Sequence, residues 1–203
     1  MLLILSASVL GFLLPFGQAE CIDGKDNVIR TGDGTPDLPI QLSDAVLLTY
    51  DKNMQPSCSR KDGGSVEGNG FLKVLSGTLI VNKEMNISGE GQPLWTFRKN
   101  DLFFGYLCQD GVPTSYFMPD ADCKLAICPR HDTQPLCDAL STVGKYDCKD
   151  LYGNDGLIQL PDFDNVVAAI LKGEWRGELK MMYNDELVMH LKIPIDNGWV
   201  YLD

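Results

Sequence analysis

Hydrophobic and polar residues alternate most regularly near the C-terminal end of the chain. One stretch has charged residues at positions 176, 178 and 180, and its other face carries Trp175, Leu179, Met181 and Tyr183. After residues 184–185, a second stretch has one face formed by Leu187, Met189, Leu191, Ile193 and Ile195. A period of two residues indicates a strand with one buried face. The two stretches therefore predict an antiparallel hairpin that turns at residues 184–185.

Shorter runs of β-branched and aromatic residues predict further strands upstream of this hairpin. These runs cover residues 45–50, 71–75, 78–82, 95–99 and 102–108. One short helix is expected at residues 135–143, because Leu136, Leu140 and Val143 recur there at helical spacing. Short strands separated by turn residues are typical of an antiparallel β-sandwich, so the expected fold class is all-β.

The first 42 residues do not fit this strand pattern. Residues 1–19 are apolar and end in small residues, which predicts a signal peptide cleaved after Ala19. Residues 20–42 are rich in Gly, Pro and Asp and show no period, so they are interpreted as an extended leader. A single domain is then expected over residues 43–203.

Composition and charge indicate the cellular compartment of the protein and exclude one class of partner. The 203 residues include 17 Lys and Arg against 28 Asp and Glu, a formal net charge of −11 that argues against nucleic acid as a partner. The seven cysteines are typical of an oxidising route, which predicts a secreted or lysosomal protein with disulfides. On that route Asn86, followed by Ile87 and Ser88, becomes an acceptor for N-glycosylation.

No sequence motif points to catalysis. The two histidines, His131 and His190, lie outside any spacing that binds zinc or activates a serine, and no phosphate-binding or dinucleotide fingerprint is present. Pairs of carboxylates such as Asp120 with Asp122, or Asp162 with Asp164, leave a glycosidase formally open because spacing alone cannot test it. The sequence therefore predicts a protein that is not an enzyme and that needs no cofactor or metal.

Four stretches between residues 102 and 195 carry a resemblance to a known family. The first runs from Leu102 to Cys108, the second from Asp122 to Cys128, and the third from Pro135 to Cys148. The fourth combines Leu160-Pro-Asp-Phe with Gly173-Glu-Trp-Arg-Gly-Glu. Their order and spacing resemble the ML-type lipid-recognition domains, the family that contains the lysosomal ganglioside activators.

The resemblance implies a cup-shaped, immunoglobulin-like β-sandwich whose two sheets separate to hold acyl chains. A protein of this kind lifts a glycolipid or phospholipid from a membrane surface, to which it binds reversibly. It then transfers the lipid or presents it to a hydrolase such as a lysosomal glycosidase. The same resemblance implies disulfides between Cys108 and Cys123 and between Cys137 and Cys148. Cys21, Cys58 and Cys128 then remain for at most one further bond, and His190 stands where the family has a cysteine.

The lipid-binding residues expected from this interpretation are the large apolar groups of the hairpin, of the preceding aromatic strands and of the apolar run 166–171. They are Trp95, Phe97, Phe104, Val167, Ile170, Leu171, Trp175, Leu179, Met181, Met189 and Leu191. The run 166–171 is either a loop that contacts a membrane or a buried strand or helical turn. The competing hypothesis is an extracellular, disulfide-bonded interaction module without lipid, joined to its partner through the odd cysteine.

Overall fold

The computed structural model describes residues 20–59, 63–102, 105–114, 116, 118–128, 134–160, 162, 171–196 and 198–203. The expected signal peptide, His131, and most of the apolar run 166–171 lie outside these residues.

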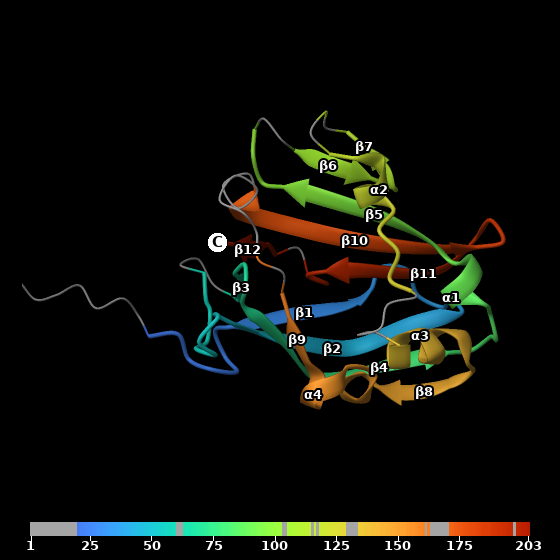
Figure 1. Ribbon diagram of the computed structural model, residues 1–203, viewed down its shortest axis with the longest axis horizontal. Coiled ribbons are helices and arrows are strands. Elements are labelled where there is room, and N and C mark those ends of the chain that lie inside the picture. Colours follow the sequence, from blue (N-terminus) through green and yellow to red (C-terminus); the bar gives the residue numbers. More distant parts are fainter. Residues whose placement is uncertain are drawn as a thin grey trace, which may run out of the picture.

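The chain forms a mostly antiparallel β-structure of two sheets that share strand β1 (Figure 1). One sheet contains β2 (Ile40–Tyr50), β4 (Phe71–Val81), β8 (Gly144–Asp147) and β9 (Leu157–Gln159). The other contains β5 (Gln92–Lys99), β6 (Tyr106–Gln109), β7 (Val112–Pro113), β10 (Gly173–Tyr183) and β11 (Glu186–Ile193). This arrangement confirms the all-β fold class.

Strand β1 (Val28–Asp33) joins the two sheets because its two ends pair with different strands. Residues 28–31 pair with β2, whereas Gly32 and Asp33 pair with Lys192 and Leu191 of β11. The expected extended leader over 20–42 and the domain boundary at residue 43 are therefore wrong. This six-residue strand was not predicted because glycines and prolines flank it and leave no regular period in the segment. Its residue Ile29 is nevertheless buried inside the fold.

The predicted hairpin and its turn are confirmed, but its second strand differs from the predicted face at two positions. A β-bulge between Met181 and Met182 places Val188 instead of Leu187 in the core, and Ile195 lies beyond the end of β11 and is exposed. In β10 and β11, Leu179 lies opposite Leu191 and Met181 lies opposite Met189. Asn184 and Asp185 both adopt positive φ angles, 49° and 61°, as a tight hairpin turn requires. Below the first half of β10, β12 (Val200–Leu202) pairs with residues 173–175 and also with β3 (Ser65–Val66).

The other predicted elements are found with altered bounds. The runs 71–75 and 78–82 belong to one long strand, β4, and only residues 106–108 of the run 102–108 are in a strand, β6. The expected helix is α3 (Gln134–Ser141), which lies over the lower sheet in Figure 1. The other helices among the described residues are single turns: α1 (Ile87–Glu90), α2 (Asp120–Cys123), η2 (Cys148–Leu151) and α4 (Gly153–Gly156). Among the described residues, no helix is both long and apolar enough to span a bilayer.

The disulfides differ in part from those that the resemblance implies. Cys108 is bonded to Cys123, as expected. The expected bond between Cys137 and Cys148 is wrong, because Cys137 is bonded to Cys128 and Cys148 is a free, buried thiol. Cys128 comes within 5.7 Å of Cys137 (Cα–Cα), whereas Cys148 starts η2 and faces β4. Cys21 and Cys58 form the third bond.

Candidate ligand-binding cavity

An apolar cavity of about 300 Å³ lies between the two sheets. One wall comes from β2 and β4, the opposite wall from β5, β10 and β11, and α3 and η2 contribute at one side. Its hydrophobic lining residues are Leu42, Ala45, Leu47, Leu72, Val74, Leu79, Trp95, Ile127, Leu136, Leu140, Leu151, Ile158, Leu179, Met189, Leu191 and Ile193. Thr31, Cys148 and Tyr152 complete the lining. A mostly apolar space of this size is at the lower end of pockets that bind small ligands, about 300–1,000 Å³.

Four of the predicted lipid-binding residues line this cavity. They are Trp95, Leu179, Met189 and Leu191. All four come from the sheet that contains β5, β10 and β11, which is the upper sheet in Figure 1. Their common position follows from register, because Leu179 lies opposite both Trp95 of β5 and Leu191 of β11. The alternation of β10 and β11 therefore identified one wall of the cavity correctly.

The other described candidates do not line it. Phe97 stacks on Trp95, with ring centroids 5.4 Å apart. Met181 is buried in the core two residues further along β10, next to α1. Trp175 is buried at the other end of β10, opposite Val200, and its indole N–H donates to the carbonyl of Leu171. Phe104, Val167 and Ile170 lie outside the described residues.

Sequence reasoning missed the second wall. Leu72 and Val74 lie in a strand that was predicted, and they alternate as inward-facing residues do. Leu47 and Leu42 lie in β2, which begins inside the supposed leader. The alternation in residues 71–75 could have predicted that Leu72 and Val74 share a buried face. It does not predict which strands lie opposite that face.

The polar groups of the lining are few, and most are already hydrogen-bonded. The Thr31 hydroxyl donates to the carbonyl of Lys192 at 2.7 Å, and the Trp95 indole N–H donates to the carbonyl of Leu125 at 3.0 Å. Burial raises the pKa of the Cys148 thiol to about 11. Burial, with a smaller contribution from Cys148, also raises the pKa of the Tyr152 hydroxyl to about 12. Both groups therefore stay neutral at physiological pH, which keeps the lining uncharged.

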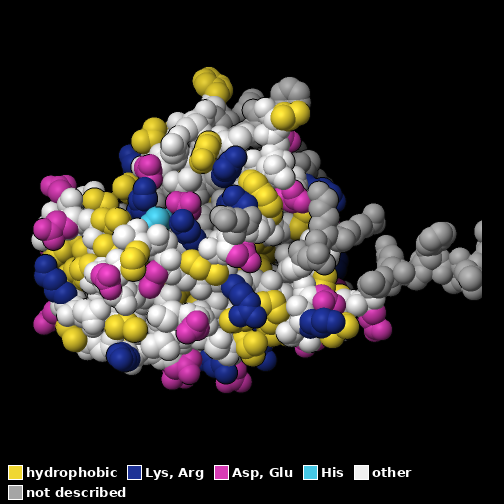
Figure 2. Space-filling model, turned by 180° about the vertical axis from the view of Figure 1, so that it is seen from behind, with side chains coloured by type: hydrophobic (Ala, Val, Ile, Leu, Met, Phe, Trp, Pro, Cys, Tyr) yellow, Lys and Arg dark blue, Asp and Glu magenta, His cyan; other side chains and the backbone are white. Residues whose placement is uncertain are grey.

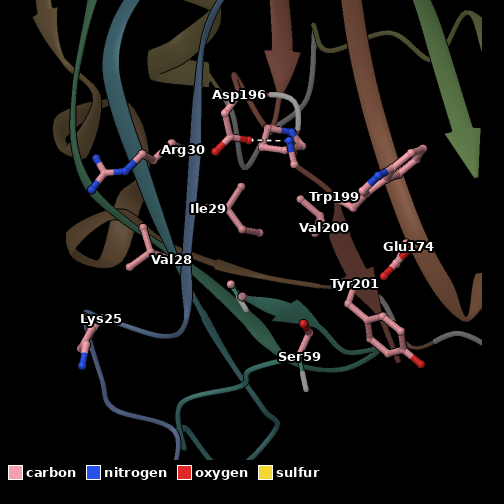
Figure 3. Close-up of a pocket in the computed structure, with 15 residues that line it drawn as sticks. Lys25, Val28, Ile29, Arg30, Ser59, Glu174, Asp196, Trp199, Val200 and Tyr201 are labelled. Atoms are coloured by element: carbon pink, nitrogen blue, oxygen red, sulfur yellow. Dashed lines mark hydrogen bonds between the residues drawn. The ribbon is translucent and has the colours of Figure 1, made fainter. Parts of the chain in front are cut away.

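A second, larger cavity of about 700 Å³ lies between β1, β12 and the segment 194–199. Figure 3 shows Ile29 in its middle, Trp199, Glu174 and Tyr201 along one side, and the Arg30 side chain directed away from these groups. Its lining mixes charged, polar, glycine and aromatic residues, so it lacks the apolar character of the first cavity.

His190 forms part of a polar cluster on the outer face of β11. Its Nδ1 lies 2.8 Å from the Thr35 hydroxyl and its Nε2 lies 3.3 Å from a Glu178 carboxylate oxygen. Gly34 covers the ring so closely that a Cβ there would lie 2.6 Å from a ring atom. Neither Thr35 nor His190 lines either cavity. The cluster therefore fastens the turn after β1 to the sheet and offers no room for a substrate. The described residues contain no group of His, Cys, Asp or Glu that could hold a metal ion.

Several large hydrophobic side chains are exposed around β6 and β7. Leu102 is 98% exposed and Tyr116 is 101% exposed, and Val112 and Tyr106 are also exposed. Hydrophobic side chains project at the top of the molecule in Figure 2. Asn86, the expected glycosylation site, is exposed and forms the N-cap of α1, where it accepts from Gly89 N–H.

Comparison of the chain with protein-family models gives no match, and comparison with curated proteins gives none either.

Proposed function

We propose that this protein is a secreted or lysosomal lipid-binding protein that holds an acyl chain between its two sheets. It carries a glycolipid or phospholipid from a membrane and transfers it or presents it to a hydrolase, without catalysing a reaction itself. The observation that carries the proposal is the uncharged, apolar cavity between the sheets. Its volume suits one chain of about ten methylene groups, taking roughly 30 Å³ for each as for a water molecule.

Three further features support the proposal. The chain's resemblance to ML-type domains implies the same kind of cavity. The hydrocarbon chain would contact Trp95, Leu179, Met189 and Leu191, and methionine adapts its shape to varied apolar ligands. Exposed Leu102 and Tyr116 would give a carrier an apolar edge for reversible contact with a bilayer.

The competing hypothesis, a covalently joined interaction module, depends on an accessible odd cysteine. The unpaired thiol is that of Cys148, which is 6% exposed and packs against Gly77 in the cavity wall. A second protein would have to enter the fold to reach it. This position favours the lipid-binding hypothesis over a disulfide-linked partner.

Filling the cavity tests the proposal. Leu72→Trp puts a larger side chain into the lining, so the protein should bind a fluorescent medium-chain fatty acid at least about tenfold more weakly. Leu75→Trp makes the same change three residues further along β4, at an exposed position outside the cavity. It should bind the probe as the original chain does.

Fluorescence titration gives both affinities, and native mass spectrometry gives the number of fatty acids bound. Circular dichroism shows whether each variant is folded. Failure of the original chain to bind the fatty acid, or equal binding by the two tryptophan variants, would contradict the proposal.

A further inference from the structure

Basic side chains gather on the outer face of the sheet formed by β5, β10 and β11, although the net charge of the chain is −11. Arg176 and Lys180 occupy outward positions of β10, and Arg98 and Lys192 occupy neighbouring strands. Lys and Arg side chains lie near one another in the upper half of Figure 2. The overall negative charge repels anions, so a local site for one requires such a concentration of cations.

Two of these cations face each other directly. In the pairing of β5 with β10, Arg98 is the cross-strand partner of Arg176. Like charges directly opposite each other in a sheet destabilise it. An anion between the two guanidinium groups would remove this repulsion.

Both arginines contact the ring of Trp199. The guanidinium carbon of Arg176 lies 4.1 Å from the centroid of the Trp199 ring, and that of Arg98 lies 5.7 Å from it. Arg98 also lies 5.5 Å from the Tyr106 ring, and the Nε of Arg176 donates to the carbonyl of Gly198 at 2.7 Å. Stacking on aromatic faces fixes guanidinium groups without using their N–H donors.

The described carboxylates near the two arginines also have other partners. Glu174 accepts a hydrogen bond from the Asn100 side chain at 2.5 Å, and Glu178 lies beside His190. Lys180 forms a salt bridge with Asp110. Arg98 is exposed and forms no salt bridge with any of the described residues. Its donors are therefore accessible to an anion from solution.

We infer that Arg98 and Arg176 bind a phosphate group on the outer face of this sheet, with Trp199 as the platform that positions them. Guanidinium groups recognise phosphate through paired N–H donors, and two of them can share one phosphate. The phosphate belongs either to a phospholipid headgroup or to free phosphate in solution. This site lies outside the acyl-chain cavity, so it does not depend on the proposed lipid-carrier function.

Binding of inorganic phosphate and of vesicles tests the inference. The full chain is titrated with phosphate by calorimetry, and its cosedimentation with phosphatidylglycerol vesicles is compared with that of phosphatidylcholine vesicles. Arg98→Gln should weaken the binding by at least about tenfold, because a hydrogen-bonded charge pair is lost. Arg98→Lys keeps the charge but loses the paired donors, so its affinity should lie between that of the original chain and that of Arg98→Gln.

Lys145→Gln is the matched control, since it removes one exposed positive charge from β8 on the other sheet. It should bind as the original chain does. If Arg98→Gln weakens binding to the vesicles alone, the ligand is a lipid headgroup. If Arg98→Gln weakens binding of inorganic phosphate, the ligand is free phosphate. No binding of either ligand by the original chain, or an equal effect of Arg98→Gln and Lys145→Gln, would overturn the inference.

Discussion

At the scale of single residues, Cys148 shows how burial controls reactivity. The thiolate is the reactive form of cysteine, and burial raises the pKa of the Cys148 thiol from 9.0 to about 11. Because the thiol is the neutral form, the folded state keeps the proton through a pH range in which an unfolded chain would already lose it. The free thiol is therefore inert in the folded protein even though it is the odd cysteine of seven.

This leads to a labelling prediction. At about pH 8, below the raised pKa, iodoacetamide should leave the folded, unreduced protein unmodified, because the thiol is both protonated and enclosed. In urea without reductant, one cysteine should react, and peptide mapping should find the label on Cys148.

The same experiment separates the two disulfide arrangements. With the bond between Cys137 and Cys148 that the family resemblance implies, the label would appear on Cys128, Cys21 or Cys58 instead. Rapid labelling of Cys148 in the folded protein would contradict its burial in the cavity wall.

At the scale of elements, β4 has a glycine, Gly77, at the point where its pairing with β2 shifts register. Gly77 has a φ of 145°, a region that residues with a Cβ rarely adopt. A Cβ at Gly77 would lie 3.0 Å from Ala45 and from the sulfur of Cys148. The close contact among β4, β2 and η2 therefore requires a residue without a side chain.

Gly77→Ala should lower the free energy of unfolding by about 1–3 kcal/mol, from backbone strain together with crowding. Gly24→Ala is the control, since Gly24 also has a positive φ of 72° but nothing lies within 4 Å of its added Cβ. Urea unfolding of both variants measures the difference. Equal losses would mean that strain alone, and no crowding, acts at Gly77.

At the scale of the whole molecule, the acidic balance determines how the protein meets charged surfaces. The isoelectric point is near 4.5, so the net charge of −11 at neutral pH falls toward zero in an acidic compartment. Repulsion from an anionic membrane then disappears, while the arginines of the upper sheet remain positively charged.

Binding to phosphatidylglycerol vesicles should therefore strengthen from about pH 7 to about pH 5. Cosedimentation at the two pH values measures this change, and phosphatidylcholine vesicles serve as the uncharged control. Equal binding to the anionic vesicles at both values would argue against a role in an acidic compartment.

The sequence by itself determined the elements whose pattern is local. Strict alternation identified the inward face of β10 and Met189, Leu191 and Ile193 of β11, and Asn184 with Asp185 identified their turn, because both depend only on neighbouring residues. The alternation failed at Leu187, because a β-bulge opposite Met181 and Met182 places Val188 in the core, and at Ile195, which lies beyond β11 and is exposed. That alternation identified Leu179, Met189 and Leu191 only as members of an apolar face, and the aromatic run 95–99 identified Trp95 only as a strand residue. The family resemblance added the expectation of a cavity and of the bond between Cys108 and Cys123.

Only the tertiary structure decided what lies opposite that face. Strand β1 is six residues long and flanked by turn residues, so its place between the sheets follows from its partners β2 and β11 and not from its own pattern. The partner of Cys137 and the opposition of Arg98 to Arg176 likewise depend on contacts between segments distant in sequence. A period of two residues says that a face is buried, but long-range packing decides which residues cover it.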